Sequence, residues 1–462
     1  MSNNIKEDLR LFQDLVGFFL REELQNPVAE YIDPRKTGAI IDIKLSKKGS
    51  SDKEFKNSLK KLLAKTPKSS SKLFFNQLFG GRHSKAVLGD LLAVMLNNSM
   101  ATYKIAGPQV AIEKEILSQV HKLIGYNNNP GGTFPTGGSM CNFMSVIMAR
   151  DKVDIQSKEK GISQKLVAYT SENAHYSLSK NASFSGLGKE NIRYIKSDNF
   201  GKINILEFQE QVKIDLKNGF IPFYLNATAG TTVLCAFDDI LSLSSVCKKH
   251  NIWLHLDGAF GGSVIFSKKY KHLVDGIHLT DSFCFNAHKT LGAPLSTSVL
   301  VVKDRDNLYN SFNNDATYLY QTHNQEFNLG KTSLECGRRN NSLKLWTMWK
   351  AIGTNGIASI VENEFKLADA ARNYINGHSD YKLYSFEESL SVCFTYKDYD
   401  SADLCAKLYE NNTLMVGFGN FKNTRFIRLV VVNCENSVDD LMRFFTILEQ
   451  FAKTNRNLIK KI

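Results

Sequence analysis

In the segment FNAHKTLG (Phe285–Gly292), Lys289 directly follows a histidine at the end of an apolar run that is typical of a buried strand. Upstream, the segment HLDGAFGG (His255–Gly262) places Asp257 after a second apolar run. Taken alone, a lysine is usually a surface residue, and an aspartate at a strand end is more often a turn former or a helix cap. Because the flanks of Lys289 are apolar and rich in glycine and proline, we expect both strands to deliver their charged side chains to one cleft.

Strand-like and helix-like segments alternate on either side of these two motifs. Helix-length spans at Leu206–Lys217 and Asp239–His250 separate several of the strands. The expected strands are Leu166–Thr170, Ile192–Ile195, Phe220–Leu225, Ile252–Asp257, Ser282–Phe285 and Ser298–Val302. This alternation predicts an α/β protein with a largely parallel sheet and helices on both of its faces. Ligands of such sheets bind beyond the carboxyl ends of the strands, which is where the two motifs fall.

The two ends of the chain have a different character. Residues 5–24 carry apolar side chains at helical spacing, which predicts an amphipathic helix that needs a partner surface. In the last third, strands at Leu390–Tyr396 and Phe426–Val432 alternate with helices at Asp403–Glu410 and Val438–Lys453. We therefore expect an N-terminal helical segment that packs across a dimer (1–75), a large cofactor-binding domain (76–335) and a small C-terminal α+β domain (336–462).

Composition limits the classes of function. The net charge is +12, and part of the excess lies in the Lys- and Ser-rich stretch Lys44–Lys72, whose polar parts we expect to be mobile. This stretch lacks the interleaved aromatic residues of a nucleic-acid site, so neither a nucleic acid nor a membrane is the predicted partner. A basic surface also attracts acidic substrates and phosphate cofactors. The eight cysteines show no zinc spacing, and the absence of a long apolar run or a signal peptide predicts a cytoplasmic protein without a metal.

A lysine paired with a carboxylate from a neighbouring strand suits pyridoxal 5'-phosphate (PLP). This cofactor needs one lysine for a Schiff base and one carboxylate against its pyridine nitrogen, which keeps the nitrogen protonated. The sequence also indicates a phosphate site, because the glycine-rich segment GGTFPTGGS (Gly131–Ser139) precedes a helical run. Backbone N–H groups at Gly138 and the hydroxyl of Ser139 could approach a phosphate there. A glycine-rich turn before a helix is common, so this signal is weak on its own.

Three further residues fit such a site, but each of them also has a common structural role that involves no cofactor. His175, in SENAHYS (Ser171–Ser177), could equally be a capping or core residue. Thr228 lies in a turn of small residues after a strand, which suits close backbone approach. Arg428 lies inside an apolar strand, where a guanidinium prefers a carboxylate. For Arg428 an internal salt bridge is the more frequent arrangement, and a substrate carboxylate is the functional one.

Together these segments resemble the group II PLP-dependent amino-acid decarboxylases, which include glutamate, cysteine sulfinate, aspartate and aromatic-amino-acid decarboxylases. The resemblance extends from about Phe74 to Phe444. Its most specific segments are Asn226–Asp238, Trp253–Gly262, Asn286–Leu300, Glu335–Arg339 and Trp346–Lys350. It implies the PLP-dependent transferase fold of type I (aspartate aminotransferase-like), with a mostly parallel sheet in the large domain, and a homodimer whose active sites are shared between subunits.

The resemblance also implies a role for each matched residue. Lys289 would form the Schiff base, Asp257 would pair with the pyridine nitrogen, and His175 would stack on the ring and help to hold the reacting groups. Ala259 would pack under the ring, and Thr228 would lie near its phenolic oxygen. The implied phosphate ligands are Ser139, Asn286 and His288, together with the turn at Gly138. Arg428 would receive the substrate carboxylate.

The substrate branch is indicated by FFNQLFGG (Phe74–Gly81), which resembles the acidic-substrate enzymes and would bring Asn76 and Gln77 to the substrate. The expected function is decarboxylation of a small acidic L-amino acid (aspartate, cysteine sulfinate or glutamate) to the amine and CO2. The alternative is a decarboxylase, or a decarboxylating aldehyde synthase, that acts on an aromatic or diamino acid. This alternative stays open because Phe327 stands near the place of a tyrosine that usually returns the proton. His323, Tyr318 or Tyr320 would have to replace it.

Overall fold

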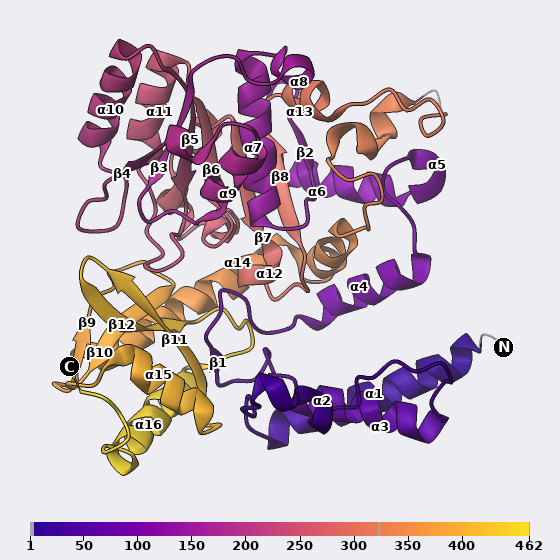
Figure 1. Cartoon of the computed structure of the whole chain (residues 1–462), viewed down its shortest axis with the longest axis vertical. Coiled ribbons are helices and arrows are strands. Elements are labelled where there is room, and N and C mark those ends of the chain that lie inside the picture. The colour runs from indigo at the N-terminus through magenta and orange to yellow at the C-terminus, as the bar shows by residue number, and fades with distance from the viewer. Residues whose placement is uncertain (1–3, 322–323, 462) are drawn as a thin grey trace.

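The computed structural model describes residues 4–321 and 324–461, and within them the strands form two sheets (Figure 1). The larger sheet has seven strands in the order β2-β8-β7-β6-β5-β3-β4. These strands are β2 (Gly131–Thr133), β3 (Leu166–Ser171), β4 (Ile192–Ile195), β5 (Ile221–Thr228), β6 (Trp253–Gly258), β7 (Ser282–Asn286) and β8 (Ser298–Val302). Only the pairs made by β8 are antiparallel. The expected mostly parallel sheet is confirmed, and all six strands expected from the sequence belong to it.

Helices cover both faces of the large sheet, because its strands alternate apolar side chains between two cores. On β7, Phe283 and Phe285 enter one core, while Cys284 enters the other. The first core is closed by α6 (Gln109–Ile124), α10 (Ile205–Lys217), α11 (Ile240–His250) and α14 (Ser342–Asn376). The second core is closed by α7 (Gly138–Val153), α9 (Ser177–Phe184) and α13 (Arg305–Phe312). Because both faces of the large sheet are buried, the strands β3, β6, β7 and β8 contain no exposed residue.

The smaller sheet has five strands in the order β1-β11-β12-β10-β9. Its strands are β1 (Phe74–Phe75), β9 (Tyr381–Leu383), β10 (Ser391–Tyr396), β11 (Met415–Phe421) and β12 (Thr424–Val430), and its helices are α15 (Ser401–Glu410) and α16 (Val438–Thr454). Phe444 and Phe445 of α16 pack into its core. The long helix α14 joins the two parts, with a kink at Gly353, where φ is 68°. The strand β1 pairs with β11, so the segment around Asn76 lies at the edge of the small sheet.

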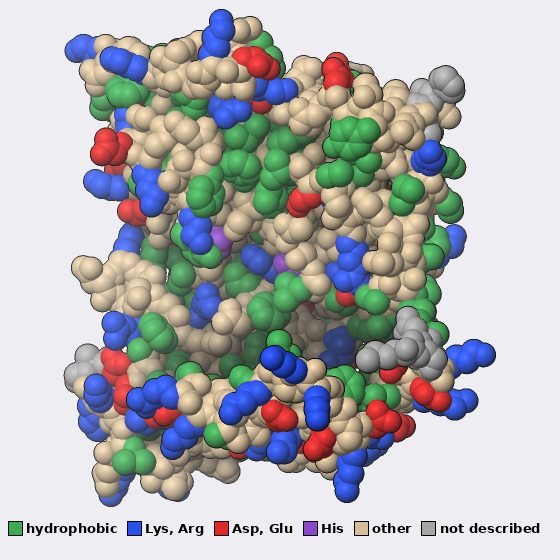
Figure 2. Space-filling view, turned by 45° about the vertical axis from the view of Figure 1, so that its right-hand side comes forward, with side chains coloured by type: hydrophobic (Ala, Val, Ile, Leu, Met, Phe, Trp, Pro, Cys, Tyr) green, Lys and Arg blue, Asp and Glu red, His purple; other side chains and the backbone are tan. Residues whose placement is uncertain are grey.

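The N-terminal helices α1 (Ile5–Gln25) and α3 (Asp52–Lys65) pack on each other and project from the rest of the chain below α4 (Ser84–Leu96) (Figure 1). The stretch Lys44–Lys72, where mobile polar parts were expected, contains α3 with a Ser51–Glu54 capping box at its start. Figure 2 shows that this side of the molecule is hollowed across its middle, above the charged side chains of the N-terminal helices. No helix of the described residues is long and apolar enough to span a membrane.

The remaining elements are short. The short α-helices are α2 (Thr37–Ile40), α5 (Tyr103–Ala106), α8 (Ser157–Lys160) and α12 (Ala287–Thr290). Two 3₁₀ segments, η6 (Gln325–Phe327) and η7 (Leu329–Thr332), follow the connection that leaves α13. Of the three residues considered as proton donors in place of Phe327, His323 lies outside the described residues.

Candidate active site

A cavity of about 200 Å³ lies at the carboxyl ends of β5, β6 and β7. It brings together residues from five separate parts of the sequence. The predicted residues that line it are Gly138, Ser139, His175, Thr228, Asp257, Ala259, Asn286, His288 and Lys289. Asp257 and Lys289 therefore face the same space, as their positions at the ends of neighbouring strands led us to expect. Asn76, Gln77 and Arg428 do not line this cavity.

Two nitrogen donors hold the carboxylate of Asp257. Nδ2 of Asn142 donates to Oδ2 at 2.7 Å, and the backbone N–H of Ala259 donates to Oδ1 at 3.0 Å. These two hydrogen bonds fix the direction of the carboxylate. Asn142 also lines the cavity and was not predicted from the sequence. It lies one helical turn after Gly138 on α7, so its proximity to the cavity follows from helical spacing once the start of that helix is known.

A chain of buried side chains stands behind Asn142. Nε2 of His255 donates to Oδ1 of Asn142 at 3.1 Å, and Nδ1 of His255 lies 2.8 Å from Oγ of Ser282. Nε1 of Trp253, which can only donate, bonds the same Oγ at 2.9 Å. Burial lowers the pKa of His255 to about 4, so its ring is neutral near pH 7. The hydroxyl of Ser282 can therefore donate to Nδ1, while the proton on Nε2 sets the orientation of the Asn142 amide.

Lys289 lies in the short helix α12, directly after β7, and is partly buried. Burial lowers the pKa of its amine, and the nearby carboxylate of Asp257 partly opposes this shift. A lowered pKa increases the neutral fraction of the amine at a given pH. The neutral amine is the form that attacks a carbonyl, so this lysine is placed and tuned for covalent chemistry.

The cavity fits a phosphorylated aromatic cofactor. Oδ1 of Asn286 and Oγ1 of Thr228 are buried without a hydrogen-bond partner among the described residues, which is costly unless a ligand supplies one. At Gly138, where α7 begins without a side-chain cap, an added Cβ would lie 2.9 Å from Cβ of Ala259. The free N–H groups of this helix end can therefore approach a phosphate closely. The residues present supply donors and acceptors for both ends of PLP.

Two histidines line the cavity in their neutral forms. The backbone N–H of Thr297 donates to Nδ1 of His288 at 3.0 Å, and burial lowers the pKa of His288 to about 4. The backbone N–H of Ser177 donates to Nδ1 of His175 at 3.2 Å, and burial lowers the pKa of His175 as well. With Nδ1 of His175 accepting, the proton of that ring resides on Nε2, which is left as a donor. Nδ1 of His288 lies 3.1 Å from the carbonyl oxygen of Thr297 as well, so it can form a hydrogen bond with either backbone group of that residue.

Arg428 lies beside the cavity and forms no internal salt bridge with any described residue. Its Nη1 donates to the carbonyl of Thr232, which lines the cavity, and its Nη2 donates to the carbonyl of Asn76, each at 3.0 Å. Its buried Nε has no partner among the described residues. The internal salt bridge considered for this arginine is thus absent from the described structure. Gln77 is exposed.

Comparison with known proteins identifies the family of the chain. A family model described as the pyridoxal-dependent decarboxylase conserved domain matches residues 34–397. The chain belongs to this family. As a PLP-dependent amino-acid decarboxylase, it is 32% identical to the cysteine sulfinic acid decarboxylase of Rattus norvegicus over 92% of each chain. It is 30% identical to the acidic amino acid decarboxylase GADL1 of Xenopus tropicalis, over 97% of this chain and 91% of the relative.

The fold of this decarboxylase matches that of a relative whose structure has been solved. The crystal structure of mouse CSAD superposes with a TM-score of 0.93 at 30% identity, covering 97% of this chain and 99% of that one. The expected type I fold, with a large and a small domain, is confirmed. When bound, PLP supplies an aromatic electron sink for the electron pair that the departing carboxylate leaves at the α-carbon.

Proposed function

We propose that this decarboxylase acts on a small acidic L-amino acid: aspartate, cysteine sulfinate or glutamate. The observation that carries the proposal is the contact between Arg428 and the backbone of Asn76. It places the segment Phe74–Gly81, which resembles the acidic-substrate enzymes, directly against the arginine beside the cavity. Relatives named for cysteine sulfinic acid and for acidic amino acids, matched over nearly the whole chain, support the same branch.

The proposed roles follow from the geometry of each side chain. Lys289 holds the cofactor covalently, and Asp257 keeps the ring nitrogen protonated through a carboxylate fixed by Asn142. His175 covers the ring and, with Nε2 as donor, holds the reacting groups. Ala259 packs against the ring beside Thr228. The phosphate site is formed by Gly138, Ser139, Asn286 and His288.

Arg428 binds and orients the substrate. Its two outer nitrogens are already fixed by backbone carbonyls, so the guanidinium keeps one direction and presents its charge to an incoming carboxylate. Fixing the substrate carboxylate relative to the ring is a proximity effect, because the bond that breaks must lie perpendicular to the ring plane. Asn76 then acts as a positioning residue through its carbonyl, whereas Gln77 would reach the substrate only after a rearrangement from its exposed position.

A substrate panel tests this proposal. The purified PLP-loaded enzyme should release CO2 from aspartate, cysteine sulfinate and glutamate with a higher kcat/KM than from diaminobutyrate, tyrosine or tryptophan. Asparagine is the matched control for aspartate, because it keeps the shape of the side chain and removes its charge. A preference for an aromatic or diamino acid, or equal rates with aspartate and asparagine, would overturn the branch assignment.

One observation favours an additional course for the same enzyme. Phe327 cannot donate a proton, and its ring is held between Nζ of Lys114, 4.0 Å from the ring centroid, and the ring of Tyr103. Tyr318 is highly exposed, and Tyr320 packs beneath Lys331, so either hydroxyl would have to move to reach the cavity. A slow proton return would allow oxygen to intercept the reaction. Hydrogen peroxide formed in proportion to CO2 would establish the decarboxylating aldehyde synthase instead.

We further propose that the chain is a homodimer in which α1 packs against the partner. Its apolar residues lie along one side of the helix and are exposed in the single chain, with exposed fractions of 47% for Leu9 and 45% for Phe12. The neighbouring helix α4 exposes a second apolar set, which includes Leu91 and Met95. Exposed apolar surface of this extent is typical of a subunit interface. The proposal includes active sites shared between the two subunits.

A further inference from the structure

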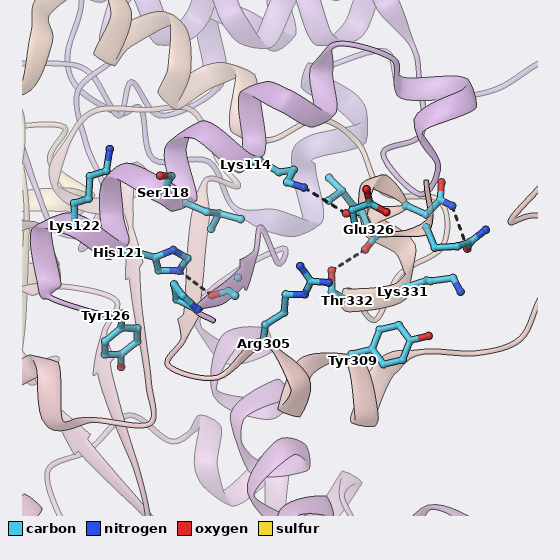
Figure 3. A pocket seen from close by; sticks show the side chains of 17 residues that line it. Lys114, Ser118, His121, Lys122, Tyr126, Arg305, Tyr309, Glu326, Lys331 and Thr332 are labelled. Atoms are coloured by element: carbon cyan, nitrogen blue, oxygen red, sulfur yellow. Dashed lines mark hydrogen bonds between the residues drawn. The ribbon is translucent and has the colours of Figure 1, made fainter. Parts of the chain in front are cut away.

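A second and larger cavity, of about 670 Å³, lies outside the active site, between α6, α13, β2 and the segment Gln325–Thr332 (Figure 3). Its walls carry four cationic side chains, Lys114, Lys122, Arg305 and Lys331, but only one acidic side chain, Glu326. None of these four cations forms a salt bridge with a described residue. A concave site lined by charges of one sign concentrates its field on a bound counter-ion.

Two of the cations point into the same space. Figure 3 shows Lys114 reaching from α6 and Arg305 reaching from α13 toward the segment that carries Glu326 and Thr332, whereas Lys122 points away. Burial and then the charge of Arg305 lower the pKa of Lys114, which shows that the two cations repel each other, while the nearby charge of Glu326 partly opposes the shift. The contacts of the Lys114 amine, a long hydrogen bond to the carbonyl of Glu326 and the ring of Phe327, do not neutralise it.

The position of Arg305 is built into the backbone. At Gly131 of β2, an added Cβ would lie 2.9 Å from Cα and from Cβ of Arg305, so only glycine leaves room for the stem of this arginine against the strand. On the opposite wall, Nε2 of His121 donates to the carbonyl of Gly131 at 2.9 Å, which occupies that carbonyl and fixes the strand. The stem of Arg305 is thus fixed on the wall of the cavity, and its guanidinium donates no hydrogen bond to the described residues.

We infer that this cavity is a binding site for a small anion that carries two or more negative charges, with Arg305 and Lys114 as its principal contacts. Guanidinium and ammonium groups that converge on one space recognise phosphate and carboxylate oxygens through charge-assisted hydrogen bonds. The volume lies within the range of small-molecule sites, so the ligand is an organic phosphate or a polycarboxylate rather than a macromolecule.

Such a ligand would tie the segment Gln325–Thr332 to the core of the large domain. Lys114 and Arg305 belong to helices that pack on the large sheet, whereas η6 and η7 follow the connection that carries Tyr318 and Tyr320. An anion bound between them relieves the repulsion of the two cations and fixes η6 against α6. The expected result is slower cleavage by chymotrypsin at the exposed Tyr318, because the downstream end of its segment becomes anchored.

Calorimetric titration of the PLP-loaded enzyme tests the inference, because the cofactor then blocks the phosphate site at Gly138. Pyrophosphate and citrate are the two probes, and they distinguish a phosphate ligand from a carboxylate ligand. We expect saturable binding of at least one probe below about 1 mM. Arg305→Gln and Lys114→Gln should each weaken it at least about tenfold, and Arg305→Lys should keep most of the affinity.

The matched control is the double variant Lys189→Gln/Lys217→Gln, which removes two exposed charges near the β4 edge, at the opposite end of the large sheet from β2. It should bind as the unaltered enzyme does. The bound probe should also slow chymotrypsin cleavage in the unaltered enzyme but not in Arg305→Gln, whose decarboxylase activity without the probe should be unchanged. Absence of saturable binding, or equal affinity in Arg305→Gln and the control, would overturn the inference.

Discussion

Nδ2 of Asn142 lies 2.7 Å from Oδ2 of Asp257, and Nε2 of His255 holds the other side of the same amide at 3.1 Å. The amide therefore cannot rotate without breaking a bond to the carboxylate or to the imidazole. A single chain of donors runs from Trp253 through Ser282, His255 and Asn142 to the carboxylate that faces the cofactor cavity. The packing of the protein core therefore fixes the direction of the Asp257 carboxylate, and in the role proposed for it this carboxylate would meet the ring nitrogen as a preorganised partner.

The first prediction concerns this hydrogen bond. Asn142→Ala should weaken PLP binding and lower kcat by about ten- to a hundredfold, because a hydrogen bond to a charged group contributes roughly 1.5–3 kcal/mol. Equilibrium titration with PLP and steady-state kinetics measure both effects. Ser177→Ala is the control, because it removes only the second acceptor of the same amide, at 3.0 Å, and should change either value less than about threefold. Equal effects of the two substitutions would contradict the role of Asn142.

The second prediction concerns stability against acid. The pKa of His255 is about 4 in the folded chain and 6.5 in the unfolded chain. Between these two pH values the unfolded chain therefore binds a proton at this residue and the folded chain does not. Its contribution to the free energy of unfolding is complete above pH 6.5 and is lost as the pH falls toward 4. In urea unfolding, His255→Gln should reduce the slope of the free energy of unfolding against pH in this range by up to about 1.4 kcal/mol per pH unit. The exposed His278→Gln is the control, and equal slopes for both variants would refute the assignment.

The third prediction concerns the covalent attachment of the cofactor. The purified enzyme should be yellow, and Lys289→Ala should lose the visible absorption of the lysine-bound cofactor together with the decarboxylase activity. Lys180→Ala, at an exposed position on α9 close enough to act on the charge of His175, should keep both. An unchanged spectrum of Lys289→Ala would place the attachment on another amine.

Much of this site follows from the sequence because its residues sit at the ends of elements with strong patterns. Lys289 and Asp257 lie at the carboxyl ends of fully buried strands, and parallel strands end at the same edge of a sheet. Asn142 and His255 were missed for a physical reason: an amide in the middle of a helix and a histidine in the middle of a strand have the pattern of ordinary core residues. Their partners are distant in sequence, so only the packing of α7 on the sheet brings them together.

The smaller sheet illustrates the same limit. The strands β10 and β12 were predicted from apolar runs, whereas the two-residue strand β1 is too short to have a period. Its pairing with β11 brings the segment of Asn76 to Arg428, and no local signal predicts a pairing over such a separation in the chain. The absence of a salt bridge at Arg428 could not be predicted from the sequence either, because it depends on which carbonyls the fold places around the guanidinium.

The fourth prediction concerns Arg428. Arg428→Gln should lower kcat/KM for the acidic substrate by about a hundredfold while the cofactor absorption stays unchanged, because a fixed charge that orients the carboxylate is lost. Arg428→Lys should recover only part of the rate, since an ammonium cannot keep both backbone contacts and bind substrate in the same geometry. Arg425→Gln is the matched control on the same strand, with a side chain that points to solvent. Loss of cofactor absorption in Arg428→Gln would indicate a structural role instead.

The fifth prediction concerns the N-terminal helix. Phe12→Glu should convert the proposed dimer to a monomer in sedimentation velocity, because it places a charge within an apolar contact whose large side chains contribute roughly 1.5–3 kcal/mol each when buried. Gln13→Glu is the matched control, since it adds the same charge one position away, where the side chain is polar. Activity should fall with the dimer fraction if the active sites are shared, and dilution of the unaltered enzyme should reproduce the same relation between mass and activity. A monomer with full activity would show that each chain completes its own site and that the apolar side of α1 serves another contact.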